Sequence, residues 1–105
     1  MSNRSSETAV LVATRDLFFR GKLEGIVKAA GARVAQEETP SLAVVELGSA
    51  AALERVRELV AAGVSVIAFG SHVEADVLRA AREAGAEAVP NSRVEAVLLA
   101  ALARS

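Results

Sequence analysis

The sequence of 105 residues contains no cysteine, tryptophan or tyrosine, and it has a single histidine. Without cysteine the chain can form neither disulfides nor thiolate-based catalytic, zinc or iron–sulfur sites. One histidine cannot provide a multi-histidine metal site. The three aromatic residues are all phenylalanine, so a surface on which nucleic-acid bases stack is not expected. These absences exclude thiol-dependent enzymes and metal sites built on cysteine or on several histidines.

Long apolar runs and an excess of one charge are also lacking. No run approaches the ~18 apolar residues of a membrane-spanning helix, and the start of the chain has no apolar segment typical of a signal peptide. Twelve basic and thirteen acidic residues are interspersed and give a net charge of −1, so no basic stripe for phosphates is expected. We therefore expect a cytoplasmic protein with no nucleic-acid or membrane partner. Residues 1–8 are expected to be a disordered tail, and residues 9–103 a single domain.

Short apolar runs rich in β-branched residues alternate with helical patterns along the chain. The predicted strands are 9–13, 33–35, 42–47, 64–69 and 87–90, and the predicted helices are 17–30, 50–62, 73–84 and 93–103. Polar residues at helix starts have the spacing of N-caps and capping boxes. The predicted capping residues are Asp16, Ser49, Ser71 with Glu74, and Ser92 with Glu95.

Alternation of strands and helices predicts an α/β fold with helices on both faces of a parallel sheet. Right-handed crossovers favour a flavodoxin-like three-layer αβα architecture with a five-stranded parallel sheet in the order 2-1-3-4-5. Residues 36–41 are polar and contain Pro40, so the second crossover helix is expected to be shortened or absent. In such sheets ligands gather at the carboxyl ends of the strands, and Glu46 lies at the end of the middle strand.

The order and spacing of three segments resemble the receiver domain of bacterial two-component response regulators, over about residues 9–103. They are the stretch from the first strand to Gly31, the run Val-Ile-Ala-Phe-Gly-Ser at 66–71, and the run Ala-Arg-Glu-Ala-Gly-Ala at 81–86. The resemblance implies a signalling function. It also implies a pocket where an acidic pair holds magnesium, an aspartate accepts a phosphoryl group, and a hydroxyl and a lysine hold the phosphoryl oxygens.

This sequence departs from that pattern at nearly every position. The acidic pair falls on Thr14 and Arg15, the acceptor on Glu46, and the hydroxyl on Gly70, with Ser71 one residue later. The lysine region is Pro90-Asn91-Ser92. The degenerate pocket thus comprises Thr14, Arg15, Asp16, Glu46, Gly70, Ser71 and Asn91. A guanidinium at a divalent-cation site opposes metal binding, so we expect no metal, no cofactor and no enzymatic activity.

These departures predict a pseudo-receiver, a regulatory domain that acts through protein contacts without phosphorylation. Arg15 and Glu46 either pair or remain two solvated side chains. Receiver domains commonly signal through the face that corresponds here to Val73, Glu74, Val77, Leu78, Ala88 and Ala96. This face is either an interaction surface for an unidentified protein or a second copy, or an ordinary amphipathic margin.

The sequence also gives expectations for Phe18 and His72 and allows one alternative function. Phe18 is expected to be half buried at a helix start, with contact to a partner as the alternative. His72 is expected at the surface, since Ser71 beside it is better suited to capping a helix than to catalysis. The alternative function is a flavodoxin-like domain that binds a small ligand, a nucleotide or a flavin at the same pocket.

Overall fold

The computed structural model describes residues 8–36 and 38–104, and the predicted tail, 1–8, lies outside them except for Thr8. The strands are β1 (Ala9–Ala13), β2 (Arg33–Val34), β3 (Leu42–Glu46), β4 (Ser65–Gly70) and β5 (Glu87–Pro90). The α-helices are α1 (Leu17–Ala29), α2 (Ala50–Ala61), α3 (Ala75–Glu83) and α4 (Val94–Arg104), and a 3-10 turn, η2 (Asn91–Arg93), precedes α4. None of the helices in this described part has the length and apolar character that a membrane crossing requires.

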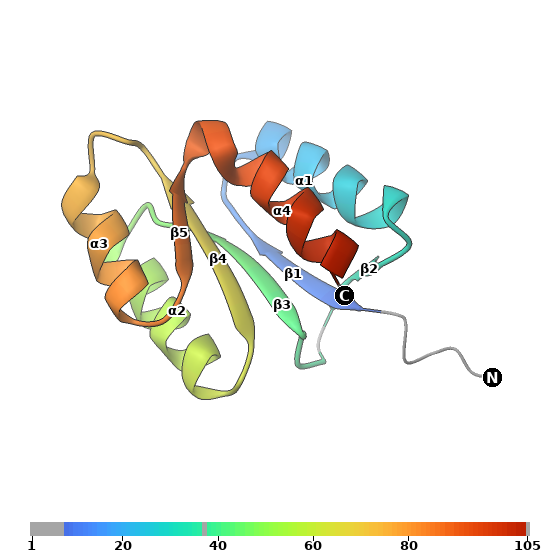
Figure 1. Cartoon of the computed structure of the whole chain (residues 1–105), viewed down its shortest axis with the longest axis horizontal. Helices are drawn as coiled ribbons and strands as arrows, with labels where there is room; N and C mark the ends of the chain where they lie inside the picture. The colour runs from blue at the N-terminus through green and yellow to red at the C-terminus, as the bar shows by residue number, and fades with distance from the viewer. Residues whose placement is uncertain (1–7, 37, 105) are drawn as a thin grey trace.

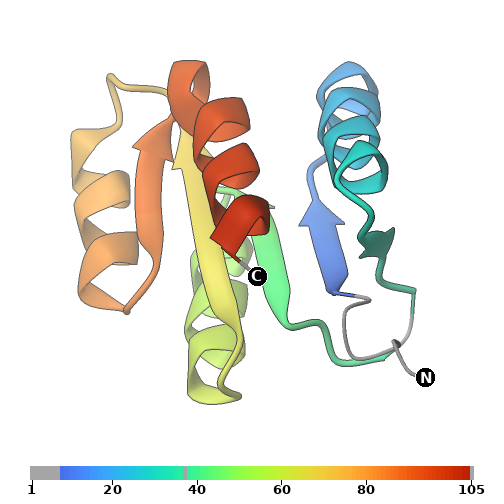
Figure 2. The same ribbon diagram turned by 45° about the vertical axis from the view of Figure 1, so that its right-hand side comes forward.

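All strand pairs are parallel, and the sheet order is β2-β1-β3-β4-β5. Helices α1 and α4 cover one face of the sheet, and α2 and α3 cover the other, as Figures 1 and 2 show. This arrangement confirms the predicted flavodoxin-like three-layer fold and its strand order.

The sheet separates two apolar cores, and β3 contributes to both of them. Val44 packs into the core under α1 and α4, which includes Leu23 and Phe69. Val45 packs into the core under α2 and α3, which includes Val56. Because successive side chains of a strand point to opposite faces, this strand is buried on both sides until it reaches Glu46, which is only partly buried. The polar end of β3 is therefore fixed at the carboxyl edge of the sheet.

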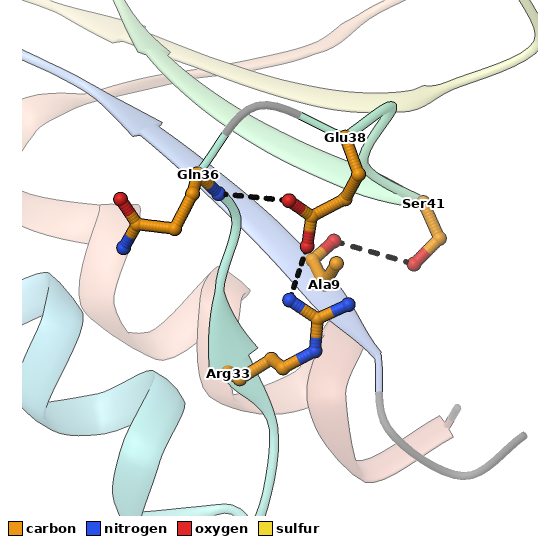
Figure 3. Close-up of polar contacts among 5 residues, drawn as sticks. All are labelled: Ala9, Arg33, Gln36, Glu38 and Ser41. Carbon is orange, nitrogen blue, oxygen red and sulfur yellow. Dashed lines mark hydrogen bonds and ion pairs between the residues drawn. The ribbon is translucent and has the colours of Figure 1, made fainter. Parts of the chain in front are cut away.

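The connection between β2 and β3 contains no helix in its described residues, 35, 36 and 38–41, which confirms the prediction for the second crossover. Side chains tie this short connection down (Figure 3). The carboxylate of Glu38 accepts hydrogen bonds from the Arg33 guanidinium and, at 3.1 Å, from the backbone N–H of Gln36. The hydroxyl of Ser41 donates to the carbonyl oxygen of Ala9 at 3.4 Å.

The two predicted capping boxes are wrong. Helix α3 begins at Ala75, two residues later than predicted, and Glu74 precedes it without a side-chain cap. The Ser71 hydroxyl instead accepts from the N–H of Val73 at 3.3 Å, within the turn after β4. At the last helix a 3-10 turn comes first, and Glu95 forms an ion pair of 2.8 Å with Lys22 of α1. The Glu95 carboxylate therefore contacts another helix instead of capping the start of its own helix.

The hydrogen bonds of Glu38 predict an unusually acidic side chain. Its own backbone N–H, the Arg33 guanidinium and the Gln36 backbone N–H lower the pKa of the Glu38 carboxyl from 4.5 to about 2. Because the folded-state pKa is depressed, the stability that this group contributes is present above pH 4.5 and is lost as the pH falls towards 2. NMR titration of the carboxyl carbon should give this low pKa, and Arg33→Gln should return it towards 4.5. Arg57→Gln is the control and should leave it unchanged. Titration of wild-type Glu38 near 4.5 would contradict the structure.

Candidate functional site

The carboxyl ends of β1 and β3 lie side by side, with Ala13 opposite Val45 in the sheet. Thr14, the residue after β1, is 5 % exposed, and its hydroxyl donates a hydrogen bond of 2.6 Å to Oε1 of Glu46. The backbone N–H of Arg15 donates to the same oxygen at 3.3 Å. A hydroxyl bonded to an ionised carboxylate forms a short, charge-assisted bond. The Glu46 carboxylate is therefore held by its own chain at the centre of the predicted pocket.

Asp16 is also engaged by the backbone. Its Oδ1 accepts from the N–H of Phe19 at 3.1 Å, which confirms the predicted N-cap of α1. The N–H of Asp16 donates to the hydroxyl oxygen of Thr14 at 3.2 Å. Thr14 therefore links the start of α1 to the end of β3, because it donates to one element and accepts from the other.

The open question of an Arg15–Glu46 pair is answered by this geometry. Arg15 is exposed, and its contact with Glu46 is made by the backbone N–H. Among the described residues its guanidinium forms no ion pair with Glu46, and the carboxylate is satisfied by Thr14 instead. Arg15 thus presents its charge to solvent at the pocket rim.

Two arginines that were absent from the predicted site belong to it. Nη2 of Arg20, on α1, donates a hydrogen bond of 2.6 Å to the backbone oxygen of Thr14, and its Nε is buried without a hydrogen-bond partner in the described structure. Arg55, on α2, lines the same pocket. The available signal for Arg20 was its position one helical turn after the capping residue Asp16, which directs its side chain back towards the strand end.

Together these residues form an open cleft of about 580 Å³ between the β1–α1 turn and the start of α2. Its lining residues are Ala13, Thr14, Arg15, Asp16, Arg20, Val45, Glu46, Gly48, Ser49, Ala51, Ala52 and Arg55. The structure therefore brings together four of the predicted pocket residues. Thr14, Arg15 and Asp16 come from the turn after β1, and Glu46 comes from the end of β3. The described residues contain no group of three or more acidic or histidine side chains that is placed to hold a metal ion.

The other three predicted pocket residues do not line this cleft. Gly70 ends β4 and pairs with Pro90, and Ser71 is occupied by the turn that follows. Asn91 is exposed in the 3-10 turn after β5. These positions lie along the same edge of the sheet, beside β4 and β5 rather than β1.

The predicted interaction face is smaller than expected. Leu78 and Ala88 are 5 % and 4 % exposed, because both pack into the core under α2 and α3, so neither is available to a partner. Val73 is 76 % exposed. Glu74 and Ala96 are also exposed, and Val77 is half-buried. The face that remains to a partner is Val73, Glu74, Val77 and Ala96.

Phe18 and His72 are both at the surface. Phe18 is 77 % exposed, so the expectation of a half-buried ring is wrong, and Lys22 Nζ lies 5.4 Å from its ring centroid. His72 is exposed, as predicted.

No protein-family model and no curated protein matches the chain, but solved structures match its fold. The receiver domain of DrrB, a Thermotoga maritima response regulator, superposes with a TM-score of 0.77 at 18% identity, over 93% of this chain and 96% of that domain. A CheY-like receiver domain protein from Methanospirillum hungatei gives 0.77 at 15% identity, over 93% and 92%. A putative pilus assembly-related protein from Burkholderia pseudomallei gives 0.70 at 19% identity, over 99% and 92%.

Longer relatives contain further parts that this chain does not match. It covers 52% of the longer DrrB chain and 26% of NtrX from Brucella abortus. At these identities the likeness concerns the fold alone, and the fold is that of a receiver domain.

The Thr14–Glu46 hydrogen bond gives a direct stability prediction. Thr14→Val keeps the shape of the side chain but leaves the Glu46 carboxylate and the Asp16 N–H without the hydroxyl. We expect the free energy of unfolding to fall by about 1–2 kcal/mol in urea denaturation, the usual cost of unpaired groups of this kind. Thr14→Ser, which keeps the hydroxyl, is the control and should lose less. Equal stability of the valine variant and the wild type would mean that the bond makes no net contribution.

Proposed function

We propose that this chain, a domain of receiver fold, is a cytoplasmic regulatory domain that acts through protein contacts without phosphorylation and without enzymatic activity. The observation that carries the proposal is the hydrogen bond from Thr14 to Glu46. It occupies the carboxylate at the position where the receiver pattern has its phosphoryl acceptor.

The pocket does not fit the magnesium ion that the receiver pattern implies. Mg²⁺ prefers hard carboxylate oxygens in near-octahedral geometry. Here Thr14 and Arg15 stand at the two acidic positions. One oxygen of Asp16 caps α1, and Oε1 of Glu46 already accepts two hydrogen bonds. A guanidinium at the rim adds a repulsive charge to this donor set.

Phosphoryl transfer needs cationic groups around the charge that develops on the transferred phosphoryl oxygens. The lysine region of the pattern, Pro90-Asn91-Ser92, contains no lysine, and the hydroxyl position is Gly70, with Ser71 one residue later. Oε1 of Glu46 on β3 is already bonded to the Thr14 hydroxyl and to the backbone N–H of Arg15. This supports a domain whose conformation is constant, rather than one switched by phosphate.

The surface that supports a protein contact is the remaining face of Val73, Glu74, Val77 and Ala96. Val73 precedes α3 and is 76 % exposed, which is high for a β-branched apolar side chain. Contact with another protein would remove this apolar side chain from water. The partner is a different protein or a second copy of this chain.

Incubation with acetyl phosphate and Mg²⁺ tests the first half of the proposal. We expect no phosphorylated Glu46 in mass spectra and no Mg²⁺-dependent change in thermal unfolding. The double variant Arg15→Asp with Glu46→Asp adds one carboxylate at an acidic position of the pattern and puts an aspartate at the acceptor position, and we expect it to gain Mg²⁺ binding. Phosphorylation of wild-type Glu46, or a wild-type thermal shift with Mg²⁺ equal to that of the double variant, would overturn the proposal.

Charge substitution on the remaining face tests the second half. Val73→Glu should release partners retained from host extract, or dissociate a self-associated form in sedimentation experiments, because a carboxylate resists desolvation. Phe18→Glu is the matched control, since Phe18 is 77 % exposed but lies at the start of α1. Loss of binding in the Phe18 variant with retention in the Val73 variant would place the contact elsewhere and contradict the assignment.

A further inference from the structure

The cleft at the end of β1 exists because the connection from β2 to β3 is short. A full crossover helix would cover β1 on the side of the sheet where α2 lies. In its absence Leu11 and Ala13, which point to that side, are only partly buried beside the core under α2 and α3. In Figure 2 that face of β1 carries no helix among the described residues. Ala13 and Val45 form the floor of the cleft, and its walls come from the β1–α1 turn and α2.

Arginines from three separate elements line this cleft. Arg15 comes from the β1–α1 turn, Arg20 from α1 and Arg55 from α2, and the only acidic lining residues are Asp16 and Glu46. Three guanidinium groups against two carboxylates leave the cleft positive, in a chain whose net charge is −1. The cleft lining therefore has one more guanidinium group than carboxylate.

Three arginines elsewhere in the described chain, Arg33, Arg57 and Arg79, pair with Glu38, Glu54 and Asp76. Arg82, Arg93 and Arg104 form no ion pair within the described residues, and Arg82 donates to the backbone oxygen of Ala88. The arginines of the cleft have no ion pair among the described residues, and the two nearby carboxylates accept hydrogen bonds from the backbone and from Thr14 instead. The two carboxylates thus balance only part of the cationic charge of the cleft.

Arg20 has a buried donor that the described residues do not pair. Its guanidinium is anchored by one hydrogen bond to the backbone oxygen of Thr14, while its Nε is buried without a partner. A buried donor without an acceptor is costly. An oxyanion bound in the cleft, with a small turn of the guanidinium towards it, would supply the acceptor that the protein does not.

The backbone at the cleft wall has the same electrostatic sign. Helix α2 begins there, with Ser49 as its N-cap and Gly48, Ser49, Ala51 and Ala52 among the lining residues. The N-terminal end of a helix carries partial positive charge and favours anions. This field adds to the three guanidinium groups, which come from elements on both sides of the cleft.

We infer that this cleft is a binding site for a phosphate group, held by Arg15, Arg20 and Arg55 and facing the start of α2. Guanidinium groups suit phosphate because their planar donors match its oxygens in pairs. A volume of about 580 Å³ falls in the range of small-molecule sites, and it exceeds what inorganic phosphate alone would fill. The shared chemistry is the phosphate group, carried either by a phosphorylated small molecule or by inorganic phosphate.

Isothermal titration calorimetry at constant ionic strength tests the site, with inorganic phosphate, ribose 5-phosphate and ribose as probes. We expect a dissociation constant of about 1 mM or tighter for ribose 5-phosphate and no binding of ribose. Tighter binding of ribose 5-phosphate than of inorganic phosphate would identify a phosphorylated small molecule as the ligand class. The reverse order would identify inorganic phosphate.

Arginine variants locate the binding. Arg55→Gln and Arg15→Gln should each weaken the affinity about tenfold, the loss of one charge-assisted hydrogen bond. Arg57→Gln is the matched control, because Arg57 lies on the same helix, pairs with Glu54 and does not line the cleft. It removes the same charge and should change the affinity less than about twofold. Circular dichroism verifies that each variant is folded.

Either of two results would overturn the inference: no titratable binding of a phosphate compound, or an equal loss in the Arg57 and Arg55 variants. Such a failure is distinguishable from failure of the proposed function. Absence of phosphate binding leaves phosphorylation-independent regulation standing. Phosphorylation of Glu46 would overturn that regulation, while Arg55-dependent phosphate binding would persist in Glu46→Gln.

Discussion

Burial of β3 on both faces is the constraint on which the rest of the structure depends. A parallel strand of this kind needs apolar cover on each side, and burying each valine side chain contributes roughly 1.5–3 kcal/mol. Helices α1 and α4 cover Val44, and helices α2 and α3 cover Val45. The helices must therefore stand on opposite faces, with β1 and β4 beside the middle strand. Glu46, the first residue of β3 outside this double cover, is thereby placed at the sheet edge.

The cover is unequal at β1, and this inequality shapes the site. Helix α1 packs on one face of β1, but the described residues of the short connection between β2 and β3 contain no helix that would cover the other face. The hydrogen bonds of Glu38 and Ser41 hold that connection close to the strands. The space that a longer crossover would fill is open to solvent, and it lies directly beside the carboxyl ends of β1 and β3.

The carboxyl edge of the sheet has the strand arrangement of a receiver fold, but Thr14 and Arg15 stand where the receiver pattern has its acidic pair. The strand order and helix layers are those of receiver domains, and guanidinium groups outnumber carboxylates around this cleft. Oε1 of Glu46 accepts a hydrogen bond from the Thr14 hydroxyl. Oδ1 of Asp16 accepts one from the backbone N–H of Phe19 at the start of α1. Guanidinium groups from three elements face the vacated space. A scaffold that positions strand ends accommodates a site for a metal or for an anion, because the side chains at those ends decide which.

Sequence patterns alone predicted the strand order, the connection without a crossover helix and the Asp16 cap. They also placed Thr14 and Arg15 where the receiver pattern has an acidic pair. These follow from local periodicity, chain length and the handedness of crossovers, which neighbouring residues encode. Three features became visible in the folded chain alone. The Leu78 side chain is buried in the core, and Glu95 pairs with Lys22 of another helix instead of capping its own. Arg20 and Arg55, from different helices, line one cleft. The reason is physical: a long side chain finds its partner across space, and the partner depends on which elements pack beside it and where a covering helix is absent.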